Sequence, residues 1–185
     1  MKYDKINTPK DLLKYMEDNI NYGYVSSDGT IYNSDSINWK NWSFNCIVQD
    51  SDGILDTKYG TCWDQVELER KWFSEHNYIF KTLFMAFNIN YENDLPTHTF
   101  LVFYENSKWY WFEHSFYDYK GIHEFKDLNR LIEYVKECQI RYVYKNKNIK
   151  FNSNDILVFE YDKPNKNMNV DEYLDFVTKN ELKDI

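Results

Sequence analysis

Cys62, His98 and Glu113 are residues whose types and spacing suit chemistry at a thiol. Cys62 follows Gly60 by two residues and precedes a helix-like run over 64–76, so we expect its sulfur at or near a helix N-terminus. Unpaired backbone N–H groups and the positive end of the helix dipole favour an anion there, and the thiolate is the nucleophilic form of cysteine. Taken alone, Cys62 fits a small buried side chain better, because free cysteine is among the most buried residue types.

A predicted β-hairpin brings the other two groups together. Strands over 97–105 and 108–115 are joined by a loop of two residues. Because side chains alternate between the two faces of a strand, this register places His98 and Glu113 on the same face, as diagonal neighbours with Cα atoms about 5–8 Å apart. A slip of one residue would separate them. The same register puts His114 on the opposite face, outside the site.

These three groups are the set used in thiol acyl chemistry. The histidine takes the proton of the thiol, the carboxylate holds the imidazole in one tautomer, and the thiolate attacks a carbonyl carbon. Glu113 alone also fits a charge on an edge strand. The three residues together are more specific than any one of them.

The segments that carry these residues resemble the transglutaminase-like proteins. Tyr59-Gly60-Thr61-Cys62-Trp63 is similar to the Tyr-Gly-x-Cys-Trp signature of that family. Thr97-His98-Thr99-Phe100, followed by Trp109-Tyr110-Trp111-Phe112-Glu113, resembles its histidine strand and the acid strand after it. The 15-residue separation of the histidine and the acid is also similar to the family's spacing. The resemblance covers roughly residues 57 to 116.

This resemblance implies a papain-like α+β fold, in which a helix bearing the cysteine packs on an antiparallel β-sheet, with flanking helices. It implies Cys62 as nucleophile, His98 as general base and acid, and Glu113 as the group that orients the imidazole. The chain departs from the family in two ways: it carries Glu113 where the family usually has Asp, and it lacks the Asp-Pro pair often found there.

An oxyanion that forms during acyl transfer needs hydrogen-bond donors. The backbone N–H of Cys62 is one natural donor. The resemblance suggests a second donor, from an aromatic or amide side chain upstream of the cysteine. The candidates for this donor and for substrate contact are Trp39, Trp42, Gln49, Tyr59 and Trp63.

Composition and charge limit the classes of protein to which the chain can belong. The chain has 185 residues, 19% of them aromatic, which is enough for one domain with an aromatic-rich core. A formal net charge of -8 argues against nucleic acid or an anionic membrane as the main partner. With three cysteines and neither a membrane-spanning run nor a signal peptide, the sequence predicts a cytoplasmic protein with reduced thiols. We expect one domain over 1–185, and the oligomeric state stays open.

Periodicity predicts the elements around the candidate site. Thr8 caps a predicted helix that begins at Pro9, contains Asp11 at its third position and ends near residues 22–23. Glu69 falls on the same side of the Cys62 helix as the cysteine, so this carboxylate is expected to have a partner in the core or on a ligand. The remaining predicted elements are strands over 46–48, 78–87, 140–144 and 156–161, and helices from Gly121 onward and over 170–179.

Three classes of function remain open at this point. The first is a cysteine hydrolase or acyl transferase acting on an amide or thioester, with hydrolysis of a peptide-like amide favoured and no cofactor or metal expected. The short chain and the absence of a calcium-loop pattern argue against a large regulated crosslinker. The second is a binding module that keeps the fold with weak or no turnover. A metal site of Cys62 and His98 ranks last, because neither CxxC nor HxxxH spacing supports it.

Overall fold

The computed structural model describes residues 6–33, 46–88, 95–165 and 167–182. The helices and strands are, in chain order, α1 (Pro9–Asn19), β1 (Asn21–Tyr22), β2 (Tyr24–Val25), β3 (Ile31–Tyr32), α2 (Ser51–Thr57), β4 (Tyr59–Gly60), α3 (Cys62–Glu75), β5 (Ile79–Phe87), β6 (His98–Glu105), β7 (Lys108–Glu113), the 3-10 turn η2 (Tyr117–Tyr119), β8 (Gly121–Phe125), α4 (Leu128–Lys147), the 3-10 turn η3 (Ser153–Asp155), β9 (Ile156–Glu160) and α5 (Val170–Val177).

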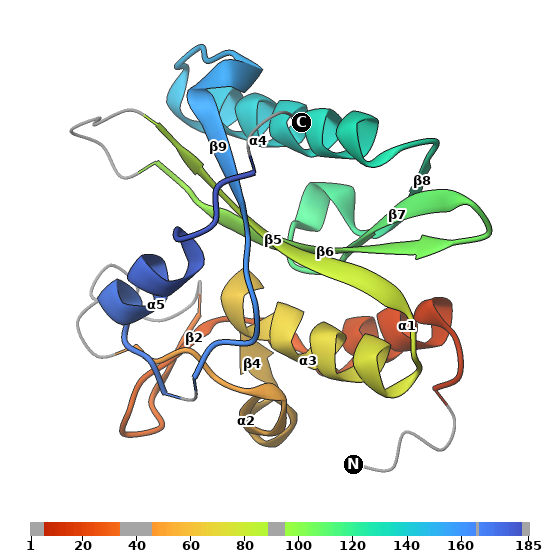
Figure 1. The fold of residues 1–185 in the computed structure, drawn as a ribbon. Helices are drawn as coiled ribbons and strands as arrows, with labels where there is room; N and C mark the ends of the chain where they lie inside the picture. The colour runs from red at the N-terminus through yellow and green to blue at the C-terminus, as the bar shows by residue number, and fades with distance from the viewer. Residues whose placement is uncertain (1–5, 34–45, 89–94, 166, 183–185) are drawn as a thin grey trace.

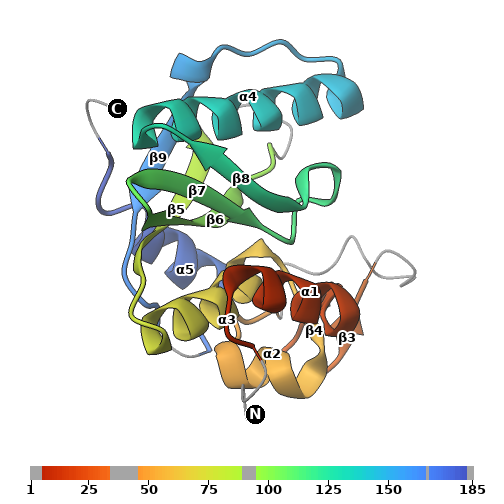
Figure 2. The same ribbon diagram turned by 90° about the vertical axis from the view of Figure 1, so that its right-hand side faces the viewer.

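The described elements form three layers around one main sheet. Five strands in the order β8-β7-β6-β5-β9 pair antiparallel throughout and make the middle layer. Helix α4 covers one face of this sheet, while α3, α1, α2 and α5 lie on the other side (Figures 1 and 2). The protein is therefore an α+β fold with an antiparallel sheet.

Alternation along β6 divides the core into two halves. Leu101 and Phe103 belong to the cluster that includes the buried face of α3, and Phe100 and Val102 belong to the cluster under α4. This is the period of two that a strand buried on both faces requires. The sheet therefore holds the α3 layer and α4 apart while contacting both.

The predicted hairpin and its register are confirmed. Glu105 pairs with Lys108, and the ladder continues in register to Leu101 opposite Phe112. Asn106 and Ser107 have φ angles of 49° and 63°, which is the left-handed conformation that the favoured two-residue hairpin turn requires at both positions.

Several other predicted elements are also present. Helix α1 begins at Pro9, and Thr8 and Asp11 form the predicted capping box. It ends at Asn19, before the predicted end, because residues 21–22 leave the helix to pair with β4. Strands β5 and β9 and helix α5 lie within two residues of the predicted ranges.

Three predictions of secondary structure are wrong. Residues 121–125 form strand β8 against β7, and the helix begins at Leu128 after the cap Asp127, because the helical spacing of apolar residues was read too far upstream. Residues 140–144 lie inside α4, whose buried face continues through Val143. Residues 46–48 form only isolated bridges to Ser26 and Asn169, not a strand.

Candidate active site

The turn before Cys62 is fixed by short-range contacts that explain its sequence. Strand β4 pairs in parallel with β1, and Gly60 lies opposite Tyr22. The Asp64 carboxylate accepts hydrogen bonds from the backbone N–H of Thr61 (2.7 Å) and from its hydroxyl (2.9 Å). A Cβ at Gly60 would lie 2.9 Å from the Asp64 Cβ, so glycine is needed for this close approach. Cys62 is thereby held as the first residue of α3, where its N–H has no acceptor within the helix.

A second segment is tied to the same turn. The backbone N–H of Gln49 donates to Asp64 over 2.7 Å, which anchors the chain before α2 to the start of α3. Burial raises the pKa of Asp64 to about 6, although hydrogen bonds from Gln49 and Thr61 oppose this. At neutral pH Asp64 is therefore largely ionised, and the carboxylate accepts the hydrogen bonds that hold the turn in place.

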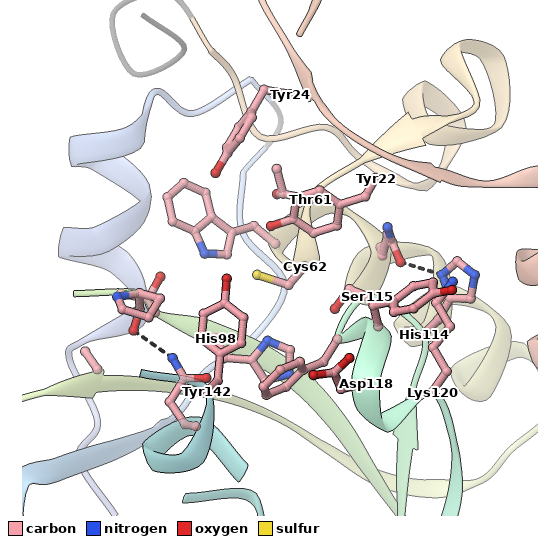
Figure 3. Close-up of a pocket in the computed structure, with 18 of the residues that line it drawn as sticks. Tyr22, Tyr24, Thr61, Cys62, His98, His114, Ser115, Asp118, Lys120 and Tyr142 are labelled. Carbon is pink, nitrogen blue, oxygen red and sulfur yellow. Dashed lines mark hydrogen bonds between the residues drawn. The ribbon is translucent and has the colours of Figure 1, made fainter. Parts of the chain in front are cut away.

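His98 and Glu113 are joined as the hairpin predicts. His98 Nε2 lies 2.8 Å from Glu113 Oε2, and both side chains are buried. Cys62 also acts on the imidazole and helps to raise its pKa, and since Nε2 is engaged by Glu113, Nδ1 is the nitrogen that remains for the thiol. Burial alone would lower the pKa of His98, but Glu113 and Cys62 raise it to about 10. His98 is thus an imidazolium at neutral pH, between a carboxylate and the sulfur (Figure 3).

Four donors hold the longer side chain of Glu113 in place. Oε2 accepts from His98 and from the Trp111 indole N–H (3.1 Å), while Oε1 accepts from the Ser115 hydroxyl (3.0 Å) and the Phe116 backbone N–H (2.6 Å). Burial would raise the pKa of Glu113, but His98 and these hydrogen bonds lower it. A fixed, ionised Glu at this position therefore supports the imidazole directly.

The supporting donors of Glu113 were missed from the sequence. Trp111 was accessible to that reasoning, because it precedes Glu113 by two residues and shares its face of the strand. Ser115 was accessible in the same way, because the predicted strand ran to residue 115 and alternation places Ser115 on the face of Glu113. Phe116 was not, since its backbone N–H acts from the turn after β7.

Cys62 and His98 line one open cavity of about 1110 Å³. Helix α5 and the end of β5 supply an apolar wall, which includes Phe87, Val170 and Leu174. The chain after β7 supplies a polar wall, which includes Ser115, Asp118 and Lys120 (Figure 3). Ligand sites combine apolar walls and a few polar groups in this way.

Three tyrosines from separate elements surround the thiol. Tyr22 lies on β1, Tyr24 on β2 and Tyr142 on α4, and all three line the cavity. Figure 3 shows the Tyr22 and Tyr142 rings reaching toward Cys62 from different sides. None of them was singled out by the sequence, because only tertiary contacts bring them to Cys62.

The residues predicted as oxyanion donors or substrate contacts lie in different places in the structure. The Gln49 amide donates to the Tyr59 carbonyl (2.8 Å) and accepts from the Thr57 hydroxyl (3.0 Å), so it braces the turn. Neither Gln49 nor Tyr59 belongs to the cavity lining, whereas Trp63 does and stacks on Tyr173 with ring centroids 4.9 Å apart. Trp39 and Trp42 lie outside the described residues.

His114 lines the cavity, contrary to its predicted place outside the site. Strand β7 ends at Glu113, so the alternation used for that prediction no longer applies. His114 Nδ1 lies 2.6 Å from Gln65 Oε1, and the Gln65 amide N–H donates to the Gly60 carbonyl over 2.8 Å. Burial, with a contribution from Lys120, lowers the pKa of His114 to about 4. The neutral ring therefore braces the first turn of α3.

Glu69 lies deep behind the triad, on the side of α3 that carries Cys62. Only 4% of its surface is exposed. Burial, and then the charge of Glu113, raise its pKa well above the ordinary value. Burial and the neighbouring charge of Glu113 thus favour the uncharged acid form of Glu69, which has less need of a charged partner than the carboxylate that the sequence suggested.

The described residues contain neither a metal-binding cluster nor a membrane-spanning helix. In that part of the chain, no group of three or more His, Cys, Asp and Glu side chains is arranged to hold a metal ion. Among the helices that the structure describes, none combines the length and the apolar character needed to cross a membrane.

Comparison with known proteins adds no family assignment. No protein-family model matches the chain, and no curated protein matches it. The chemistry of the site therefore rests on its own geometry.

Proposed function

We propose that the protein is a cysteine-dependent hydrolase or acyl transferase of the transglutaminase-like type, with a papain-like arrangement of helix and sheet. Cys62 is the nucleophile, His98 the general base and acid, and Glu113 the orienting group. The observation that carries this proposal is the buried 2.8 Å hydrogen bond between His98 and Glu113, with Cys62 at the start of a helix also raising the pKa of the imidazole.

The proposed reaction begins with a thiolate–imidazolium pair. The Cys62 thiolate attacks the carbonyl carbon of an amide or thioester, and the Cys62 N–H donates to the oxygen on which charge develops. His98 then gives its proton to the departing amine or thiol. In the second half, His98 takes a proton from water or another nucleophile, which releases the acyl group from the sulfur.

A peptide-like amide is the favoured substrate class, and its hydrolysis the favoured reaction. The cavity is open and combines an apolar wall with polar groups, which suits an extended chain with a polar backbone. The net charge of -8 makes nucleic acid and anionic membranes poor partners. The chemistry requires no cofactor, and a cytoplasmic location follows from the same proposal because a free thiol must stay reduced.

The alkylation rate of Cys62 tests the proposal. Iodoacetamide is applied between pH 4 and 9, and each cysteine is followed separately by mass spectrometry. Fast labelling of Cys62 below pH 7 that is lost in His98→Ala is expected, because the imidazolium stabilises the thiolate. Cys46 and Cys138 are internal controls, since burial raises the pKa of both thiols. Slow labelling that is independent of His98 would instead favour a binding module.

A further inference from the structure

His114 is a buried histidine that the proposed reaction does not use. Resting on the acyl chemistry proposed above, we propose that His114 is a positioning residue. Acting through Gln65, it holds the turn before Cys62 in the orientation in which the thiol and the Cys62 N–H meet the same carbonyl group. Consecutive residues at the end of one strand then serve the two halves of the site, Glu113 the base and His114 the nucleophile.

The peptide unit between Gly60 and Thr61 is held at both ends by side chains of the first turn of α3. Its N–H group, from Thr61, donates to the Asp64 carboxylate over 2.7 Å. Its carbonyl group, from Gly60, accepts from the Gln65 amide over 2.8 Å. The next peptide unit along the chain carries the Cys62 N–H. A rotation of the held unit would therefore shift both that N–H and the Cys62 side chain.

His114 fixes which way the Gln65 amide lies. His114 Nδ1 is 2.6 Å from Gln65 Oε1, and a dashed line in Figure 3 marks this hydrogen bond. Because the Gln65 N–H already donates to the Gly60 carbonyl, the Gln65 oxygen is the acceptor here and the ring donates from Nδ1. A turned amide would set its oxygen against the Gly60 carbonyl oxygen, and two acceptors form no hydrogen bond. Both side chains are buried, so bulk water does not replace either partner.

The protonation of the ring suits this role. Burial, with a contribution from Lys120, lowers the pKa of His114 to about 4, although the charge of Glu113 opposes this. At neutral pH the ring therefore carries its single proton on Nδ1 and a lone pair on Nε2. Nε2 is buried and has no hydrogen-bond partner among the described residues. A buried polar atom without a partner costs stability, so the fold accepts that cost at Nε2 while Nδ1 holds the amide.

The hydrogen bond between His114 and Gln65 joins the two layers that carry the site. His114 directly follows β7, whose last residue, Glu113, bonds the imidazole of His98. Gln65 lies in the first turn of α3, which begins with Cys62. This bond therefore sets the nucleophile against its base across the boundary between sheet and helix. Its loss would leave the acid–base pair in place and change how the thiol and its N–H meet a carbonyl group.

Paired substitutions separate the hydrogen bond from the shape of the side chain. In His114→Asn the amide nitrogen takes the place of Nδ1 and donates, whereas His114→Leu fills a similar space without a donor. Gln65→Met removes the other partner, and the double variant of His114→Leu with Gln65→Met tests whether the two residues act as one unit. His76→Leu is the control, because His76 caps the far end of α3 and lies outside the cavity lining.

Two reagents report how the thiol meets a carbonyl group. p-Nitrophenyl acetate acetylates a cysteine through an oxyanion, so its rate depends on the alignment of the thiolate and the Cys62 N–H. Iodoacetamide alkylates the thiolate by displacement and forms no oxyanion. Both rates are measured at Cys62 by mass spectrometry at neutral pH.

Acetylation is expected to fall by about 10²-fold in His114→Leu and in Gln65→Met, the cost of misplacing reacting groups by about 1 Å. The double variant should fall no further, because its second substitution removes a bond that is already lost. His114→Asn should stay within about threefold of the wild type, and so should alkylation in every variant, since that reaction forms no oxyanion. His76→Leu should change neither rate. Unfolding midpoints show which variants are folded, and if His114→Leu is not, Gln65→Met against His114→Asn makes the same comparison.

Several results would overturn the inference and leave the proposed function standing. Equal acetylation rates for His114→Asn and His114→Leu would mean that the donor has no part in the reaction. Effects that add in the double variant would mean that His114 does not act through Gln65, and an equal fall in both reactions would place its effect on the ionisation of the thiol. A wild type that is alkylated in a His98-dependent manner but not acetylated would also remove the inference. Loss of the His98 dependence in the wild type would remove the proposed function itself.

Discussion

Replacing Glu113 by Gln tests the electrostatic argument for the site most directly. The substitution keeps the shape of the side chain and removes the charge that faces His98. It also puts an amide NH₂ group where the carboxylate accepted hydrogen bonds, so a donor now faces the N–H of Trp111 or of Phe116. Both the protonation of His98 and the stability of the fold should respond.

The size of the effect follows from the pKa of His98. That pKa is about 10, against an ordinary value of 6.5, and the difference of about 3.5 units corresponds to about 5 kcal/mol in favour of the imidazolium. Burial opposes this shift, and Glu113 is the largest favourable contribution. If the variant returns the pKa to about 6.5, the protonated fraction at pH 8 falls from nearly all to roughly 3%, a loss of roughly 30-fold.

The assay is the iodoacetamide rate of Cys62 against pH, combined with the imidazole titration of His98 followed by NMR. Glu113→Gln should lose roughly 30-fold in rate at pH 7, where an unaided thiol is only about 3% ionised, and should approach the wild type above about pH 9, where the thiol ionises without help. Glu124→Gln is the matched control, because this exposed carboxylate pairs with Lys108 away from the site. Superimposable profiles for the wild type and Glu113→Gln would refute the reasoning.

The pair of His98 and Glu113 also makes a pH-dependent contribution to the free energy of unfolding. The raised pKa of His98 contributes fully below about pH 6.5, and this contribution is lost as the pH rises through about 10. The lowered pKa of Glu113 contributes above its ordinary value of 4.5 and is lost on acidification. Both contributions are present between about pH 4.5 and pH 6.5, so the loss of stability in Glu113→Gln should be greatest there. Urea unfolding at several pH values would show this.

Two further predictions concern the support of the Cys62 turn. Gly60→Ala should destabilise the fold by about 1–3 kcal/mol, because its Cβ would lie 2.9 Å from that of Asp64. The control is Gly53→Ala inside α2, where the nearest contact of the added Cβ is 3.3 Å. Equal urea midpoints for the two variants would contradict the packing argument. The pKa of His114 is lowered from 6.5 to about 4, so its contribution is present above about pH 6.5 and is lost as the pH falls through about 4. His114→Gln should therefore lose less stability than the wild type on acidification, by up to about 3 kcal/mol, and a pH-independent difference between the two proteins in urea unfolding would exclude this role.

The hairpin could be predicted because everything that determines it is local. A two-residue turn at Asn106 and Ser107 sets the register, and alternation then places His98 and Glu113 on one face. The helix start at Cys62 was equally accessible, since Gly60 and the residues that cap the helix lie within four positions of one another.

Strand β8 could not be found in the same way. Its five residues, Gly121 to Phe125, contain only two large apolar side chains, and Phe125 falls at helical spacing from Leu128. The helical period thus continues across the boundary, and Asp127, the cap of α4, was the signal that would have placed it. For the strand predicted over 140–144, branched side chains outweighed the continuing helical face.

The tyrosines around the thiol mark the limit of sequence reasoning for this site. Tyr22 reaches Cys62 through a ladder of two residue pairs between strands that are 38 positions apart in the sequence. Tyr142 does so from α4, on the other side of the sheet. No periodic pattern or local motif records such contacts, because they follow from how complete layers pack.

The division of the site between layers has a mechanical consequence. The imidazole and its carboxylate belong to one hairpin and are joined by a 2.8 Å hydrogen bond, whereas the sulfur belongs to the helical layer packed against it. A small sliding motion of α3 along the sheet would alter the reach of the nucleophile and also remove the part of the raised His98 pKa that comes from Cys62. A ligand that separates the layers would therefore weaken the nucleophile and its base together, because each depends on the contact between them.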